Sequence, residues 1–241
     1  MSSCVLEVIA FNIESCHIAQ RAGADRIELC DNPGEGGTTP SFGFIKAARA
    51  AVNIQLFPII RPRGGDFLYS DEEFEIMKDD VLLCKQLGCD GVVIGLLKAD
   101  GTVDKERTAA LVQLAYPMSV TFHRAFDRTA NPFEAMEDII ACGCERILTS
   151  GQRPTVTEGA HMLKQLVDKA EDRIIIMPGS GVRSGNIEGL KSQTGAMEFH
   201  SSARTTLPSS MSYTSPSMQE TMSTVILDEA EVVRLVRLLN P

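Results

Sequence analysis

Eight short apolar runs, separated by stretches with helical periodicity, constrain the fold of this 241-residue chain more than any other feature. Strict alternation of strands and helices indicates a parallel sheet covered by helices, since parallel strands need long crossover connections. Eight such units in about 250 residues are typical of a TIM-type (β/α)8 barrel, and the sequence predicts a single barrel domain over residues 1–241. An open doubly wound sheet is the alternative. The runs lie at residues 6–11, 26–30, 54–63, 91–97, 119–126, 146–150, 173–181 and 196–203.

Four of the joints between a helix and the next strand contain the same element, a glycine a few residues before the strand: RAGADRIEL, QLGCDGVVI, ACGCERILT and SQTGAMEFH. Glycine suits the left-handed position that closes many helices. One structural unit is therefore expected to recur along the chain.

The segment 205–224 interrupts this alternation. It is rich in Ser, Thr, Met and Pro and shows no apolar periodicity. In a barrel it would follow the eighth strand, at the C-terminal mouth. We expect a flexible loop or a lid before the final helix, DEAEVVRLVRLLN.

Charge and hydropathy exclude several classes of protein. The net charge is -9, whereas proteins that bind nucleic acid usually carry a basic face. No apolar run reaches the roughly 18 residues of a membrane-spanning helix, and the N-terminus lacks the basic region of a signal peptide. Seven cysteines without a CxxC pair are typical of reduced, buried thiols. We expect a cytoplasmic protein that binds neither nucleic acid nor membranes.

Charged side chains interrupt the apolar runs near their C-terminal ends, where the strands of a barrel meet around one mouth. One interpretation is an inert network of ion pairs inside the barrel. The other is a polar pocket that can hold an anion and move a proton. The residues concerned are Glu7, Glu28, Arg61, Arg63, His123, Arg124, Asp127, Glu198 and His200.

Three arginines are the candidates for binding an anion. Arg61 and Arg63 are expected on the same face of the third strand, and Arg124 lies at the end of the fifth. Guanidinium groups bind carboxylates and phosphates through two parallel hydrogen bonds. The sequence therefore predicts an anion clamp at the mouth.

An imidazole next to carboxylates is the candidate for proton transfer. His123 is expected to exchange a proton together with Glu28 or Glu7, and Asp127 is expected to orient His123. These four residues are the predicted catalytic group.

A glycine-rich turn, MPGSGVRSGN, follows the seventh strand and contains Gly179 and Gly181. Free backbone N–H groups there could face a phosphate, and the loops after strands 7 and 8 are the usual phosphate position in this fold. Ser150 and Gly151 after the sixth strand and His200 on the eighth are further candidates for ligand binding. Glycine-rich turns also occur for geometric reasons alone, so the interpretation stays open.

Several blocks, in order along the chain, resemble the CutC family of copper homeostasis proteins: LEVIAFNIESCHIAQRAGADRIELC, GGTTPSFGFIKAAR, IIRPRGGDFLYSDEEF, TFHRAFDRTANPFEA, LTSG, MPGSGV and EFHSSAR. The resemblance covers residues 5 to about 204 and implies a TIM-type barrel that forms a homo-oligomer, a dimer or tetramer. It also implies a role in copper tolerance or trafficking with Cu(I) binding. It brings no established reaction.

Copper binding and an anionic ligand make different demands on the chain. Cu(I) prefers thiolates and thioethers, and Cys16 and Cys30 are the soft ligands best placed to bind it. The predicted mouth instead carries carboxylates and guanidiniums. Two hypotheses therefore stand: a copper-handling protein, and a barrel enzyme that acts on a small anionic or phosphorylated metabolite.

Overall fold

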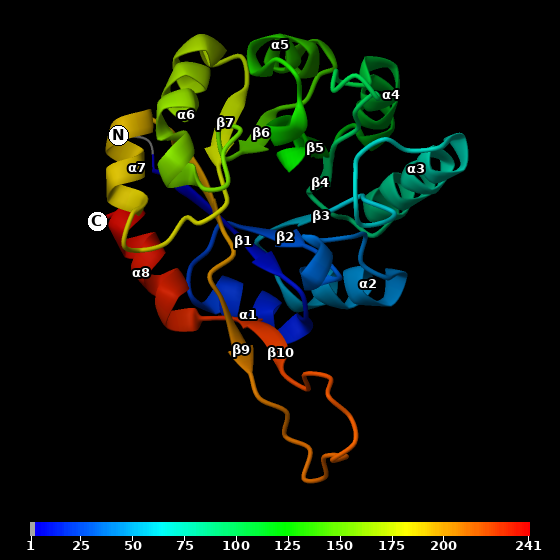
Figure 1. Ribbon diagram of the computed structural model, residues 1–241, viewed down its shortest axis with the longest axis vertical. Coiled ribbons are helices and arrows are strands. Elements are labelled where there is room, and N and C mark those ends of the chain that lie inside the picture. The colour runs from blue at the N-terminus through cyan, green and yellow to red at the C-terminus, as the bar shows by residue number, and fades with distance from the viewer. Residues whose placement is uncertain (1–2) are drawn as a thin grey trace.

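Eight parallel strands form a closed barrel in the computed structural model, which describes residues 3–241 (Figure 1). The hydrogen-bonded orders are β3-β2-β1-β8 and β4-β5-β6-β7. A bridge between Ile59 and Val93 joins the two groups, and β7 packs beside β8 to close the ring. The barrel predicted from the alternation is confirmed. The strands are β1 Val5–Ala10, β2 Arg26–Leu29, β3 Gln55–Pro58, β4 Gly91–Ile94, β5 Ser119–Phe122, β6 Arg146–Thr149, β7 Ile175–Pro178 and β8 Glu198–Ser201.

Within the described part of the chain, eight α-helices surround the barrel, and the last of them, α8, packs next to α7 and α1 and so completes the outer ring (Figure 1). All but α7 begin at a residue whose side chain accepts a hydrogen bond from the first turn, which fixes where each loop ends. No helix among residues 3–241 combines the length and hydropathy needed to span a membrane. The helices are α1 Ile13–Arg21, α2 Phe42–Ala51, α3 Asp71–Gln86, α4 Lys105–Ala115, α5 Pro132–Ala141, α6 Val156–Ala170, α7 Ile187–Thr194 and α8 Glu229–Leu239.

The repeated glycines are explained by the backbone. Gly23, Gly88, Gly143 and Gly195 have φ of 89°, 75°, 87° and 74°, each between a helix and the next strand. Only glycine takes this conformation without strain. The predicted recurring joint is confirmed.

Two strands end earlier than their apolar runs. β3 ends at Pro58 and β5 at Phe122, and a short 3-10 helix, η2, occupies Arg124–Arg128. The apolar residues beyond Pro58 are buried in a loop at the mouth instead. Because they are apolar and consecutive, the sequence pattern predicts a longer strand. Strand alternation therefore does not govern Arg61 and Arg63, and the prediction that they share a face of β3 is wrong.

A two-stranded arm, residues 204–227, follows the barrel. It contains β9 Arg204–Leu207 and β10 Thr224–Leu227, which pair antiparallel, and it projects away from the barrel (Figure 1). Both ends of the predicted loop are thus strands, because their Thr, Val and Ile residues favour extended backbone. Of the arm, only Arg204 is among the residues that line the cavity described below. Closure of the arm over the mouth stays a prediction.

Candidate functional site

A cavity of about 830 Å³ opens at the carboxyl ends of the strands; we call it the mouth cavity. More cationic than anionic side chains line it, although the whole chain carries a net charge of -9. Such a concentration of opposite charge attracts anionic ligands. The cations are Arg61, Lys98, Arg124, Arg128 and Arg204, and the carboxylates are Glu28, Glu35 and Asp66.

An ion-pair network of mostly buried side chains lies at the first residues of β2, β6 and β8. Glu198 accepts hydrogen bonds from Arg26 at 2.7 and 2.8 Å and from Arg146 at 2.6 and 3.3 Å. Glu7 lies 3.5 Å from Arg26. The sequence analysis offered an ion-pair network and a polar pocket as alternatives. The structure contains both, next to each other. Arg26 and Arg146 were missed by the sequence analysis; the signal was an arginine at the start of the strands RIEL and RILT.

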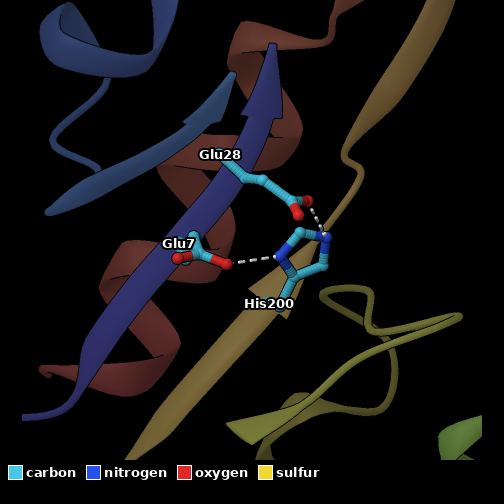
Figure 2. A group of neighbouring side chains, drawn as sticks. All are labelled: Glu7, Glu28 and His200. Carbon is cyan, nitrogen blue, oxygen red and sulfur yellow. Dashed lines mark hydrogen bonds and ion pairs between the residues drawn. The ribbon is translucent and has the colours of Figure 1, made fainter. Parts of the chain in front are cut away.

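Glu7, His200 and Glu28 connect the network to the mouth cavity. Figure 2 shows both carboxylates pointing toward the ring of His200. They project from the adjacent strands β1, β8 and β2, and β1 places Glu7 directly beside His200 in the sheet register. Nδ1 of His200 lies 2.7 Å from Oε1 of Glu7, and Nε2 lies 3.7 Å from Oε2 of Glu28. His200 and Glu28 line the cavity, whereas Glu7 lies behind them and is fully buried.

The pKa values of the three groups shift in different directions. Burial raises the pKa of Glu28 to about 7, and the charge of Glu7 adds to this effect. Burial alone would lower the pKa of His200, but the hydrogen bond with Glu7 and the charge of Glu28 outweigh it and raise the pKa. Burial opposes ionisation of Glu7, but His200 and Arg26 lower its pKa. Glu7 is therefore ionised and accepts the proton of Nδ1.

Charge balance assigns one exchangeable proton to this site. The cluster contains the buried carboxylates of Glu7 and Glu28, the carboxylate of Glu198, which is 12% exposed, and two buried guanidiniums. One additional proton neutralises it, since buried charge is costly unless paired. Nε2 of His200 lies 3.7 Å from Oε2 of Glu28, beyond hydrogen-bond distance, so the additional proton resides on one or the other of these two groups.

The three ligand atoms of Glu7, Glu28 and His200 lie within 4.8 Å of one another. Imidazole nitrogen and carboxylate oxygen are ligands for divalent cations, whereas Cu(I) prefers sulfur. The cluster therefore does not fit Cu(I).

His123 does not have the role predicted from the sequence. Its ring is buried, and Nδ1 accepts a hydrogen bond from the N–H of Ala125 at 3.1 Å, which leaves the proton on Nε2. Burial and the charge of Arg61 lower the pKa of His123 to about 3. His123 is therefore neutral near pH 7 and poorly suited as an acid or base. Among residues 3–241, no group pairs with its Nε2.

Asp127 does not orient His123. Its carboxylate accepts hydrogen bonds from the hydroxyls of Thr149 and Ser150 and from the N–H groups of Ser150 and Gln152. It also pairs with Nε of Arg124 at 2.8 Å. Asp127 thus fixes the loop after β6, because it lies in η2, which packs against that strand.

The loop after β6 contributes less to the cavity than predicted. Ser150 donates to Asp127 and accepts from Arg124, whose guanidinium lines the cavity. Gly151, with φ of 71°, packs against the backbone of Gly159 in α6. Neither Ser150 nor Gly151 is among the lining residues.

The predicted clamp of two arginines is not formed. Arg61 lines the cavity, but it donates to the carbonyls of Glu35, Gly37 and Gly65 at 2.7 to 2.9 Å. It thereby connects two loops of the mouth. Arg63 lies outside the cavity lining and pairs with Glu73 at the start of α3.

Glycine is required for different reasons at the two positions predicted after β7, Gly179 and Gly181. A Cβ on Gly179 would lie 2.3 Å from Cδ1 of Leu148 and 3.3 Å from Cβ of His200, so only glycine lets the end of β7 pack there. Gly181 has φ of 87° and lines the cavity. His200, predicted only to bind a ligand, lies beside Glu7 and Glu28, where the sequence analysis expected His123.

The two predicted copper ligands lie in different apolar environments. Cys16 belongs to the main core, and Cys30 packs in a small separate cluster with Phe57, Ile59 and Val93. Burial raises the pKa of Cys16 to about 12 and, with the charge of Glu28, raises the pKa of Cys30 well above its usual value. Both are therefore protonated thiols, a form that binds metal poorly. The prediction that Cys16 and Cys30 bind copper together does not fit their location in two separate clusters.

Comparison with known proteins identifies the family. The model of the CutC family matches residues 4–205. The chain belongs to the CutC family. Its CutC relatives include a protein of Chromobacterium violaceum named as a family protein CutC, 56% identical over 209 residues, which are 87% of this chain and 85% of the relative.

A human protein named copper homeostasis protein cutC homolog is 46% identical over 214 residues, 89% of this chain and 78% of the relative. Among solved structures, a protein from Streptococcus agalactiae, named in connection with copper homeostasis as CutC, is 34% identical. It superposes with a TM-score of 0.79 over 83% of this chain and 98% of its own. These likenesses confirm the predicted family and barrel.

Proposed function

We propose that this CutC chain is an enzyme that binds a small anionic metabolite in the mouth cavity and exchanges a proton with it. The observation that supports this most is the Glu28–His200 pair, whose ionisable atoms lie 3.7 Å apart at the wall of a cavity lined by five cationic side chains. Cations retain the anion, and the pair is positioned to transfer the proton.

Each member of the pair has a defined part in this proposal. Glu28, with its pKa raised to about 7, is present in both protonation states near neutral pH, as an efficient acid or base requires. His200 supplies or receives the additional proton. Glu7 is a positioning residue: its hydrogen bond to Nδ1 fixes the ring so that Nε2 faces Glu28.

The test combines ligand binding with turnover. Thermal unfolding is measured with a panel of small carboxylates and phosphates, and compounds that stabilise the protein are incubated with it and followed by ¹H NMR. We expect Glu28→Gln to keep ligand-induced stabilisation and to lose turnover, whereas Glu35→Gln, at an exposed carboxylate of the same cavity, keeps both. A panel in which no anion stabilises the protein, or a fully active Glu28→Gln variant, contradicts the proposal.

Copper handling is the second candidate, supported by the name of the human relative, which is 46% identical. Cu(I) held in a competing chelator is titrated into the reduced protein and into the Cys16→Ser/Cys30→Ser double variant. Binding tighter than about micromolar that the double variant loses supports copper binding through these thiols. Equal binding by both proteins contradicts a role of these two thiols, and absence of binding contradicts copper binding altogether.

A cytoplasmic location and a homo-oligomer belong to the same proposal, since the family resemblance implies them. Light scattering behind a sizing column measures the oligomer: a mass above the 26.2 kDa of one chain supports it, and a mass of one chain contradicts it.

A further inference from the structure

The loops after β7 and β8 form one end of the mouth cavity and carry backbone donors without partners. Ser180 and Gly181 follow β7, Ser202 follows β8, and all three line the cavity. Within the described residues, the N–H groups of these three residues form no hydrogen bond with the protein. Polar backbone groups of this kind bind water or a ligand. This end of the cavity is therefore a set of donors that an anion could use.

The conformation of the loop after β7 depends on its small residues. Ser180 and Gly181 both have positive φ, 84° and 87°, in succession. Successive N–H groups in turns of unusual dihedral angles commonly form concave anion sites. Arg204, exposed at the start of the arm, adds a positive charge to the same cavity.

The acid–base pair lies directly beside this loop. Gly179 precedes Ser180, and a Cβ at Gly179 would lie 3.3 Å from Cβ and 3.4 Å from Cδ2 of His200. An anion held by the loop is thus a short distance from His200 and Glu28. A ligand that reaches both needs only a few atoms between its anionic group and its reacting atom.

We infer that the ligand is a short phosphate monoester whose phosphate binds the N–H groups of Ser180, Gly181 and Ser202 beside Arg204. The inference rests on the proposed function and names its substrate class. A phosphate has three terminal oxygens and so accepts more hydrogen bonds than a carboxylate, which matches three backbone donors and a guanidinium. The loops after strands 7 and 8 are also the usual phosphate position in this fold.

The experiment is calorimetric titration with three probes: inorganic phosphate, glycerol 3-phosphate, and glycerate, a carboxylate with the same number of carbons. Two variants alter the site, Gly181→Ala through its positive φ and Arg204→Ala through its charge. Their matched controls are Gly185→Ala, at an open position without positive φ, and Arg237→Ala, at an exposed arginine of α8. We expect glycerol 3-phosphate to bind more tightly than glycerate, and both site variants to bind it about tenfold more weakly, with the controls unchanged.

The outcomes separate this inference from the proposed function. Binding of glycerate without either phosphate overturns the phosphate assignment and leaves an anion-binding enzyme. Equal affinity of all four variants for glycerol 3-phosphate places the phosphate elsewhere and also overturns it. Absence of binding by all three probes contradicts both. If Gly181→Ala lacks a cooperative melting transition, Arg204→Ala alone decides.

Discussion

The Glu28→Gln variant should change how folding stability depends on pH. The pKa of Glu28 is raised from 4.5 to about 7 by burial, a difference of about 2.5. Each pH unit corresponds to about 1.36 kcal/mol, so Glu28 makes the free energy of unfolding fall by about 3 kcal/mol between pH 4.5 and 7. The side chain is 5% exposed, so solvent screening does not reduce this figure appreciably.

The direction of this pH dependence is set by the difference in bound protons between the folded and unfolded states. Above pH 4.5 the unfolded chain releases the Glu28 proton while the folded protein still holds it, so folding becomes less favourable as pH rises, up to pH 7. His200, whose pKa is also raised, loses its stabilising contribution as pH rises through its folded pKa, in the same direction. Glutamine cannot ionise and removes part of the charge that holds the His200 proton.

The measurement is urea unfolding, followed by circular dichroism at pH values from 5 to 8. The stability of Glu28→Gln relative to the native sequence should increase by roughly 2 to 3 kcal/mol over this range. Glu35→Gln, in the same cavity but exposed, should show a much smaller change. A difference between Glu28→Gln and the native protein that stays constant with pH would refute the raised pKa of Glu28.

Three further predictions concern the residues around the site. Gly95→Ala would place a Cβ 2.3 Å from the His123 ring and should destabilise the protein by about 1–3 kcal/mol in thermal or urea unfolding; Gly189→Ala, in open space on α7, should not destabilise it. ¹⁵N NMR of His123 should show a neutral ring with the proton on Nε2 from pH 5 to 8, and titration within this range would contradict the burial argument. Glu198→Gln leaves two buried guanidiniums poorly neutralised and should cost about 3–5 kcal/mol of unfolding free energy, a loss under 1 kcal/mol being the contrary result.

The fold was predictable because its signals are local. Alternating apolar and amphipathic runs and the glycines at the joints, such as Gly23 and Gly143, depend on a few neighbouring residues. Strand ends were less predictable, since the buried residues after Pro58 continue the apolar pattern into a loop. The error moved Arg61 and Arg63 from a supposed strand face to two different environments.

The location of the site was also predictable, but the pairing within it was not. Charged residues at the C-terminal ends of parallel strands must gather at one mouth, and Glu28, His123 and His200 do line one cavity. The choice of partners depends on which strands are neighbours around the barrel. Glu7 and His200 are 193 residues apart in the sequence and 2.7 Å apart in the structure.

The two histidines show how strand order determines chemistry. His123 and His200 both lie at the C-terminal end of a barrel strand and are indistinguishable by sequence pattern. Closure of the barrel places β8 beside β1, so His200 faces Glu7 in register, whereas His123 faces the cation of Arg61. A nearby carboxylate stabilises the protonated imidazole and raises its pKa. A nearby guanidinium destabilises the protonated imidazole and lowers its pKa. The order of strands around the barrel therefore raises the pKa of His200, whereas burial and the charge of Arg61 keep His123 neutral.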